Sequence, residues 1–285
     1  MSFYISLSGL KAAQSDLSTI SNNVANVNST SFKKSRTNFG DIFSAAPMQT
    51  TSQVAGQGTR ITGIQQQFTQ GTIETTDKTL DLAITGEAFF TVRTPPPTSQ
   101  ISYTRNGAFQ LDENRFIIDT TGARLQALPV DPVTGVVTST ASSSLQDIQI
   151  PLSYTTTPVP PATTGTVIQL SSVGVSTTGL VTATFADGTT QKIGNVAMAA
   201  FASQEGLRQQ GDAHWQATIQ SGTAAYGSGN AGLYGTVRSG ALERSNVDIT
   251  EELVALISAQ RNFQANAKAI ESASNMTQAI VNLRS

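Results

Sequence analysis

The sequence of 285 residues contains no cysteine, which excludes disulfide bridges, thiol catalysis and cysteine-based metal sites. It has a single histidine, His214, and this excludes the usual multi-histidine metal sites as well. Charged residues make up only 13% of the chain, and 17 basic against 19 acidic residues leave a net charge of -2. This balance gives no electrostatic footprint for nucleic acid or for an anionic membrane surface, so we expect neither as a partner.

Long apolar runs are lacking too. No stretch reaches the roughly 18 apolar residues of a membrane-spanning helix, so we expect no direct membrane insertion. The N-terminus also lacks the basic region, the apolar region and the small-residue cleavage site of a secretory signal. If the chain leaves the cell, we expect a route that does not cut a signal peptide.

Motifs of catalytic sites are not found either. A serine triad would have to use His214, yet no Gly-x-Ser-x-Gly elbow supplies its nucleophile, and beside Trp215 this histidine is better interpreted as a packing or surface residue. The glycine-rich residues 227–229 lack the following lysine of a phosphate loop, and Asp112 with Glu113 fits a turn. The sequence therefore predicts a protein that is not an enzyme and uses no cofactor or metal.

What the chain does have is a helical stripe at each end. From Asp248 to Leu283, one seven-residue row consists of Ile249, Leu256, Phe263 and Ile270, and the second of Leu253, Gln260 and Ala267. From Phe3 to Val27, the rows are Phe3, Leu10, Leu17 and Val24, and Ser6, Ala13, Ile20 and Val27. Coiled coils have this spacing, although any amphipathic helix of a globular protein can show one such stripe. Because both ends carry it and are otherwise rich in small polar residues, we interpret the two helices as a paired assembly device.

Local signals mark the ends of both helices. Asp248 followed by Glu251 is typical of a helix start, and the acidic pair Glu251 and Glu252 suits the positive end of the helix dipole. The N-terminal helix is expected to end in asparagines whose side chains bond local backbone, namely Asn22, Asn23, Asn26 and Asn28. The basic cluster that follows fits a solvated loop or a pairing site for a neighbour's carboxylate; it consists of Lys33, Lys34 and Arg36.

Between the helices the sequence indicates β-structure. Short predicted strands are separated by turns, as in an all-β domain; they span 59–64, 67–72, 80–84, 89–93, 102–105, 108–111, 115–119, 180–185, 189–193, 196–201 and 215–219. Asp187-Gly188 predicts a two-residue hairpin turn, and residues 222–240 an irregular return towards the last helix. The Ser/Thr/Pro-rich residues 138–166 predict one or two short strands and then an extended connection at 158–161.

Together these features predict an α+β fold, with paired, coiled-coil-like terminal α-helices and a mainly antiparallel β domain. We divide the chain into a terminal helical domain of residues 1–33 and 246–285 and a β-rich domain of residues 34–245.

Several motifs resemble those of bacterial flagellar rod and hook proteins. At the N-terminus these are Asn22, Asn23 and Asn26 within residues 21–26, then Phe32-Lys33; at the C-terminus they are residues 240–248, which end in Ser245, Asn246, Val247 and Asp248, followed by 251–254 and 260–263. Inside the chain, residues 80–84 with Gly86 and Phe89-Phe90 are similar, as is the pattern of Tyr103, Arg105, Gly107, Phe109 and Asp112. The resemblance covers both ends and most of the β-region, and only about 129–167 is without a match.

Within this family, residues 39–43, the short passage from there to Gly58, and residues 199–207 are most similar to the hook proteins. Distal rod proteins carry a longer insertion after the first helix. Hook proteins usually have an outer β-domain, whose place here holds only the segment of about 138–166, so the chain length is closer to a rod protein's. Ser31 stands where the family often has glycine, so a left-handed turn there is either absent or made by an asparagine nearby.

The resemblance implies a structural subunit of the flagellar hook, which polymerises into a curved hollow tube and transmits torque as a flexible joint between rod and filament. The partners it implies are other copies of the chain, the rod and hook-filament junction proteins, the hook cap and the flagellar export apparatus. The implied location is the basal body and hook outside the cell, after export without a cleaved signal.

Two alternatives remain open on the sequence. A distal rod subunit would form a straight drive shaft from the same terminal helices. A secreted β-rich adhesin or carbohydrate-processing protein would need neither helix. For a hook subunit or a distal rod subunit, we expect the helix packing to depend on Leu10, Leu17, Ile20, Val24, Val27, Leu253, Leu256, Phe263, Ala267 and Ile270.

Overall fold

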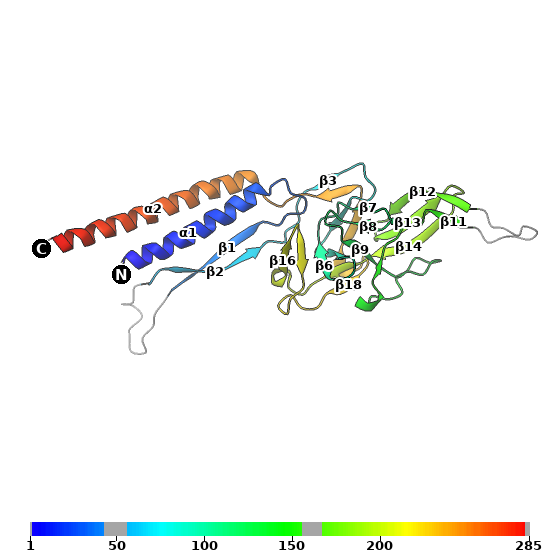
Figure 1. Cartoon of the computed structure of the whole chain (residues 1–285), viewed down its shortest axis with the longest axis horizontal. Coiled ribbons are helices and arrows are strands. Elements are labelled where there is room, and N and C mark those ends of the chain that lie inside the picture. Colours follow the sequence, from blue (N-terminus) through cyan, green and yellow to red (C-terminus); the bar gives the residue numbers. More distant parts are fainter. Residues whose placement is uncertain (1, 43–55, 156–166, 283–285) are drawn as a thin grey trace, which may run out of the picture. The chain divides into compact units, whose positions relative to one another are not determined.

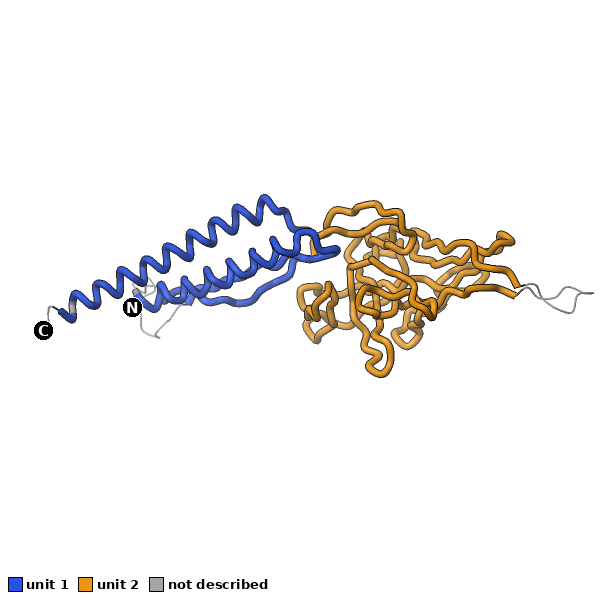
Figure 2. The backbone as a smooth tube through the Cα atoms, turned by 45° about the horizontal axis from the view of Figure 1, so that its top comes forward, with its two compact units in different colours: residues 1–67, 246–285 blue, residues 68–245 orange. Residues whose placement is uncertain are grey.

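The computed structural model describes residues 2–42, 56–155 and 167–282. The chain divides into two compact units, one made of residues 1–67 with 246–285 and the other of residues 68–245 (Figure 2). Helices occupy the chain ends and antiparallel strands the centre (Figure 1). The predicted α+β fold is therefore confirmed.

The first unit contains two helices, α1 (Ser2–Ala25) and α2 (Ile249–Asn282), which lie side by side and run antiparallel (Figures 1 and 2). Near the start of α1, a Cβ atom on Gly9 would lie 2.6 Å from Oδ1 of Asn266. Near its end, Nδ2 of Asn23 donates to Oε2 of Glu252 at 3.2 Å. The two contacts are separated by the same number of residues on each helix, which fixes the register of the pair.

The register leaves part of α2 without a partner on α1. The second helix has 34 residues and the first 24, so the residues from about Ser274 onward extend beyond the start of α1. The described side chains in this extension, including Met276 and Val281, are exposed.

A hairpin of β1 (Ser35–Asp41) and β2 (Thr59–Gln66) completes the first unit. It packs on α1, where Oγ1 of Thr37 donates to Oγ1 of Thr19 at 3.0 Å. Our division of the sequence placed residues 34–67 with the β-rich region, whereas the structural units divide at 67/68. The hairpin belongs to the first unit because its residues bond to α1, as Thr37 does to Thr19 and Ser35 to Asn23. Local sequence patterns do not indicate such bonds. The Thr-, Ser-, Gln- and Gly-rich composition of residues 47–58 predicts an exposed linker or long loop, and most of that segment lies outside the described residues.

The turn between α1 and the hairpin departs from both alternatives considered above. Ser31 itself adopts the left-handed conformation, with φ of 56°, and is fully buried. The asparagines instead bond to local groups: Nδ2 of Asn26 donates to the carbonyl oxygen of Asn22 at 3.0 Å, and Oδ1 of Asn26 accepts from Oγ of Ser29 at 3.0 Å. The left-handed turn is therefore present, although a serine makes it at a steric cost that glycine avoids.

The second unit is built of antiparallel strands (Figure 1). In chain order these are β3 (Ile73–Thr75), β4 (Leu82–Thr85), β5 (Phe89–Arg93), β6 (Ile101–Thr104), β7 (Gln110–Leu111), β8 (Ile117–Ile118), β9 (Arg124–Leu128), β10 (Gln146–Asp147), β11 (Ser153–Thr155), β12 (Val167–Val175), β13 (Leu180–Phe185), β14 (Thr190–Val196), β15 (Met198–Ala200), β16 (Arg208–Gly211), β17 (His214–Gln216), β18 (Ala225–Gly227), β19 (Thr236–Ser239) and β20 (Ala241–Glu243). Short 3-10 turns lie at Ser142–Ser144, Gln204–Gly206 and Gly232–Tyr234.

The main sheet of this unit has the strand order β11-β12-β13-β14-β9-β5-β6-β17-β16, and β19 pairs with β4 and β20 with β3 in separate ribbons. Strand β5 lies inside the sheet, between β9 and β6, and presents successive side chains to opposite faces. Phe90 packs against Phe109, with ring centroids 5.4 Å apart, while Phe89 packs against Trp215 at 5.7 Å. The sheet therefore buries apolar side chains on both faces.

Several local predictions for this unit fail in detail. Strand 180–185 has the predicted bounds, but its hairpin loop has three residues, because N–H of Phe185 bonds to the carbonyl oxygen of Thr189 and only Gly188 in the loop has a positive φ. A two-residue turn of the expected type needs two such residues. The predicted strand 67–72 is not formed, and residues 222–240 contain β18 and β19 rather than an irregular return. The proline connection at 158–161 lies outside the described residues.

Candidate functional site

The face between the two helices contains most of the predicted packing residues. Ala259 is 2% exposed, and Leu256, Phe263 and Ile270 are half-buried on the same face of α2. On α1, Ala13 and Ile20 are buried, and Leu10, Leu17 and Val24 are half-buried; Val27, also half-buried, lies in the turn after the helix. One predicted row of each helix is thus at least partly withdrawn from solvent.

The second predicted row of α2 is displaced by one residue. Leu253 is 44% exposed, whereas Glu252 and Asn266 face α1 and bring polar atoms to the contact. Ala267 is half-buried beside Asn266. Glu252 and Asn266 could not be found from the apolar periodicity, because both side chains are polar and Leu253 is the apolar residue next to Glu252.

A second apolar surface of α2 remains exposed in the single chain. We call it the outer face; it consists of Ile249, Leu253, Val254 and Ile257, which are 48%, 44%, 61% and 50% exposed. Monomeric proteins rarely leave contiguous apolar side chains uncovered, and such patches mark interaction sites. The outer face is therefore a candidate surface for assembly.

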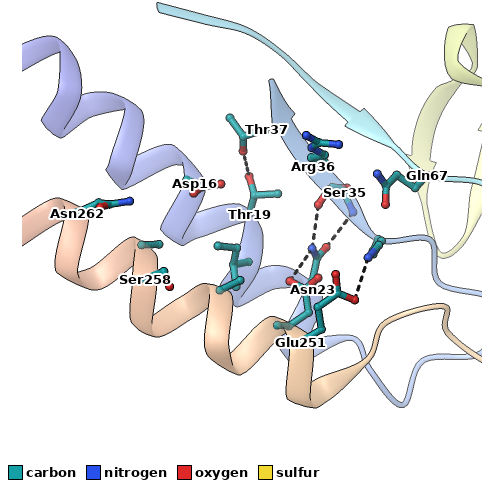
Figure 3. Close-up of a pocket in the computed structure, with 15 residues that line it drawn as sticks. Asp16, Thr19, Asn23, Ser35, Arg36, Thr37, Gln67, Glu251, Ser258 and Asn262 are labelled. Atoms are coloured by element: carbon teal, nitrogen blue, oxygen red, sulfur yellow. Dashed lines mark hydrogen bonds and ion pairs between the residues drawn. The ribbon is translucent and has the colours of Figure 1, made fainter. Parts of the chain in front are cut away.

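Asn23 joins three of the four elements of the first unit (Figure 3). This side chain is 1% exposed. Its Nδ2 donates to the carbonyl oxygen of Ser35 at 2.9 Å as well as to Glu252, and its Oδ1 accepts from N–H of Ser35 at 2.9 Å. The motif asparagine thus positions α1, β1 and α2 relative to one another.

The C-terminal motif fixes the start of α2. Oδ1 of Asn246 accepts from N–H of Lys34 at 2.8 Å and its Nδ2 donates to the carbonyl oxygen of Gln67 at 2.8 Å. Oδ1 of Asp248 accepts from N–H of Thr250 at 2.8 Å and of Glu251 at 3.1 Å, so the predicted helix start is confirmed.

The other motif residues lie close to Asn23 and Asn246. Val247 is 8% and Ser245 is 9% exposed. The carbonyl oxygen of Phe32 accepts from N–H of Asn246 at 3.3 Å. Lys34 pairs with Glu251 at 3.6 Å, so a carboxylate of the same chain is the partner of this member of the basic cluster.

A polar groove opens between α1, α2 and β1 (Figure 3). It encloses about 370 Å³ and is lined by side chains of all three elements, among them Asp16, Thr37, Arg36, Glu251, Ser258 and Asn262. Sequence reasoning did not find it, because its walls come from segments more than 200 residues apart in the chain.

The second unit contains a buried ion pair instead of a catalytic histidine. Nδ1 of His214 donates to the carbonyl oxygen of Asp212 at 2.8 Å, and Nε2 donates to the carboxylate of Asp119 at 2.7 Å. Because both oxygens only accept, both ring nitrogens carry protons and the ring is cationic. Oδ1 of Asp119 also accepts from N–H of Ala123 at 2.9 Å. The pair ties together two turns of the sheet and has no nucleophile to activate.

The ion pair predicts how stability varies with pH. Burial alone lowers the pKa of His214 and raises that of Asp119, but their mutual hydrogen bond and charges outweigh burial, so the pKa of His214 is raised and that of Asp119 is lowered. The histidine contribution is then complete below its ordinary pKa of 6.5 and lost above it, and the aspartate contribution is complete above 3.8 and lost below it. Urea unfolding midpoints of the second unit should be highest between these values.

A matched variant separates this pair from other titrating groups. His214→Gln should lower the midpoint near pH 6 and flatten its decline towards pH 9. A decline of the same size in this variant and in the unchanged chain would contradict the assignment.

The internal motif residues support the core of the second unit. The guanidinium of Arg105, 1% exposed, donates from Nη1 to the carbonyl oxygen of Gly86 at 2.8 Å and lies 3.8 Å from Oε2 of Glu243. Oε1 of Glu243 accepts from N–H of Gly71 at 2.8 Å. The carbonyl oxygen of Gly107 accepts a hydrogen bond from N–H of Leu82 at 2.9 Å. These residues are structural.

Nothing in the described residues resembles a metal or membrane site. No group of three or more histidine, aspartate or glutamate side chains gathers in residues 2–42, 56–155 and 167–282. In the same part of the chain, neither helix is apolar enough over a sufficient length to cross a bilayer.

Three segments of the chain match families of flagellar proteins. Residues 3–33 match the family described as flagella basal body rod protein, and residues 238–283 the flagellar basal body rod FlgEFG protein C-terminal family. Residues 83–183 match the flagellar hook protein FlgE/F/G D1 domain.

Whole proteins of this kind are also similar to the chain. The flagellar basal-body rod protein FlgG of Bacillus subtilis is 34% identical over 299 residues, which cover 99% of this chain and 98% of that protein. FlgG of Borreliella burgdorferi is 31% identical over 290 residues, with 97% and 96% covered. The flagellar hook protein FlgE of Salmonella typhimurium is 28% identical over 413 residues, with 100% of both chains covered.

The chain therefore belongs to the family of bacterial flagellar hook and rod proteins. It is a structural subunit of the flagellar axis and not an enzyme.

Proposed function

We propose that the protein is the hook subunit of a flagellum and polymerises through its terminal helices into a curved hollow tube. The observation that carries the proposal is the outer face of α2, whose apolar side chains are uncovered in the single chain. The hook protein FlgE aligns with the whole of this chain, which supports the hook in particular, as do residues 39–43 and 199–207, which are most similar to hook proteins.

In this proposal each face of α2 has its own task. The face with Leu256 and Phe263 forms a coiled-coil-like pair with α1 of the same subunit. The outer face packs on neighbouring subunits and resists twist about the tube axis. The β-rich unit, with residues 138–166 in the place of a larger outer domain, slides over its neighbours when the tube bends. Torque and bending are thus carried by different parts of the subunit.

The proposed setting follows from the family. The subunit would reach the outside of the cell through the flagellar export apparatus without a cleaved signal. It would then contact rod proteins, junction proteins and the hook cap at the two ends of the tube.

A distal rod subunit is the second candidate. Alignment with the hook protein runs over 413 positions, far more than the 285 residues of this chain, so much of the hook protein lies opposite gaps. Alignment with FlgG of Bacillus subtilis runs over 299 positions and leaves few gaps. Chain length thus favours the rod.

Electron microscopy of the purified, polymerised protein tests both candidates. Curved, supercoiled tubes are expected for a hook subunit, and straight tubes would move the assignment to the rod. A protein that forms no tubes under any polymerising condition would contradict both.

Substitutions on the two faces of α2 should have different effects. Leu253→Asp or Ile257→Asp places a charge in the proposed contact between subunits and should raise the critical concentration for tube formation about 100-fold, the equivalent of about 2.7 kcal/mol. The helical circular dichroism of the free subunit should not change. Leu256→Asp or Phe263→Asp should lower both tube formation and helicity, because these side chains lie between α1 and α2.

Ser272→Asp is the matched control, since it adds the same charge at an exposed polar position of α2. Critical concentrations are read from pelleting assays at rising protein concentration. If Leu253→Asp and Ser272→Asp formed tubes at the same concentration, the outer face would not be an assembly surface.

A further inference from the structure

Asp16 is a carboxylate that forms no ion pair with the described residues of its own chain. It lies half-buried on α1 at the polar groove (Figure 3). No hydrogen bond or ion pair to its side chain occurs within residues 2–42, 56–155 and 167–282. Burial raises its pKa, so the charged form is disfavoured there and has no compensating contact.

Several neighbouring polar groups of the groove are already engaged. Thr37 bonds to Thr19, and Lys34 pairs with Glu251. Arg36, on β1, is exposed and forms no ion pair with the described residues. Since carboxylates outnumber cations along the walls, the groove is suited to receive one further positive charge.

A cation of the required kind lies on another face of α2. Arg261 follows Ile257 by four residues and so extends the outer face of α2 by one turn. It is exposed and makes no ion pair within the described part of the chain. In the register fixed by Gly9 and Asn23, Asp16 lies opposite Ala259, so Arg261 is at nearly the same level along the pair.

The groove and the outer face cannot meet within one subunit, because they lie on different sides of α2. We propose that the groove of one copy accepts the outer face of α2 from a second copy, with Arg261 of the second copy paired to Asp16. Such a contact joins two different patches, so the first copy keeps a free outer face and the second copy keeps a free groove. Further copies can add at both ends, and a head-to-tail contact that does not close into a ring continues into an open helical array. The inference rests on the proposed function and names the surfaces that polymerisation brings together.

Arginine is well suited to this role. Its guanidinium binds a carboxylate through two parallel hydrogen bonds, and it is more weakly hydrated than lysine, which favours its use at interfaces. The apolar side chain of Ile257, 50% exposed in the single chain, would be covered beside it.

Charge reversal in the full-length protein tests the pairing. Asp16→Arg or Arg261→Asp alone places like charges together and should raise the critical concentration for tube formation about tenfold, while the double variant should return to within about threefold of the unchanged protein. Assembly should be induced by a neutral crowding polymer at low salt, because salt screens ion pairs. Thermal unfolding of each free subunit verifies that the variants fold.

Lys268→Asp is the matched control, since it reverses a charge on the same exposed side of α2 two turns further on; it should change the critical concentration less than about twofold. Rescue by the double variant supports the pairing. Three results would overturn the pairing while tube formation stands. The single variants could have the critical concentration of the unchanged protein, or the double variant could have one no lower than either single variant. The third result is a critical concentration of Lys268→Asp equal to that of Arg261→Asp. If the unchanged protein forms no tubes either, both the pairing and the proposed function are overturned.

Discussion

Gly107→Ala is expected to prevent stable folding of the β-rich unit. A Cβ atom at this position would overlap the backbone carbonyl oxygen of Leu82, and N–H of Leu82 bonds to the carbonyl oxygen of Gly107 at 2.9 Å. Because both partners are backbone in a buried region, no side-chain rotation can relieve the overlap. We expect a loss of about 3 kcal/mol or more in the free energy of unfolding, measured by urea titration of the β-sheet circular dichroism.

Gly174→Ala is the control for this substitution. Gly174 lies in β12 of the same unit, has no positive φ, and a Cβ there would meet only Oγ1 of Thr182 at an ordinary 3.5 Å. This variant should unfold at nearly the same urea concentration as the unchanged chain. Equal stability of the two glycine variants would show that the backbone contact at Gly107 does not limit folding.

Removing one member of the buried pair of Arg105 and Glu243 should also be severe. The two side chains are 1% and 0% exposed, and the guanidinium carbon lies 4.9 Å from the ring centre of Phe89. Burial lowers the pKa of Arg105, and the charge of Glu243 opposes that shift. Glu243→Gln would remove the charge that most stabilises this buried cation, at a cost of about 3 to 5 kcal/mol.

A double-mutant cycle measures the coupling directly. The double variant Arg105→Met with Glu243→Gln should lose clearly less stability than the sum of the single variants, because no buried charge is left uncompensated. Glu74→Gln serves as the comparison, since the pair of Glu74 and Arg244 is 55% and 49% exposed and its loss should leave the unfolding midpoint unchanged. Additive single effects at Arg105 and Glu243 would contradict the assigned ion pair.

Periodicity in the sequence was sufficient to predict the terminal helices and one packing row. Leu256, Phe263 and Ile270 are half-buried on one face of α2, as expected of apolar side chains at seven-residue spacing. The second row could not be predicted, because Glu252 becomes favourable at the contact only through its bond to Asn23, which is 229 residues away in the chain.

Long-range bonds also explain what was missed in the candidate site. The polar groove depends on residues of strand β1 such as Thr37. The strand is held against α1 by the bond of Thr37 to Thr19 and by the bond from N–H of Ser35 to Asn23. No pattern in the strand itself indicates that partner. In the β-rich unit, by contrast, the predicted bounds of 180–185 were correct, because alternation and a nearby Asp-Gly are local signals.

The unequal lengths of α1 and α2 have a consequence for proteolysis. The described side chains of α2 beyond the start of α1 are exposed, and an isolated helical segment so short is marginal in water. A protease that requires extended backbone should therefore cut a free subunit first near Met276, before it attacks the segment held against α1. Once a neighbour covers this segment, the same bond becomes resistant, so the chain end would distinguish subunits in transit from subunits already in place.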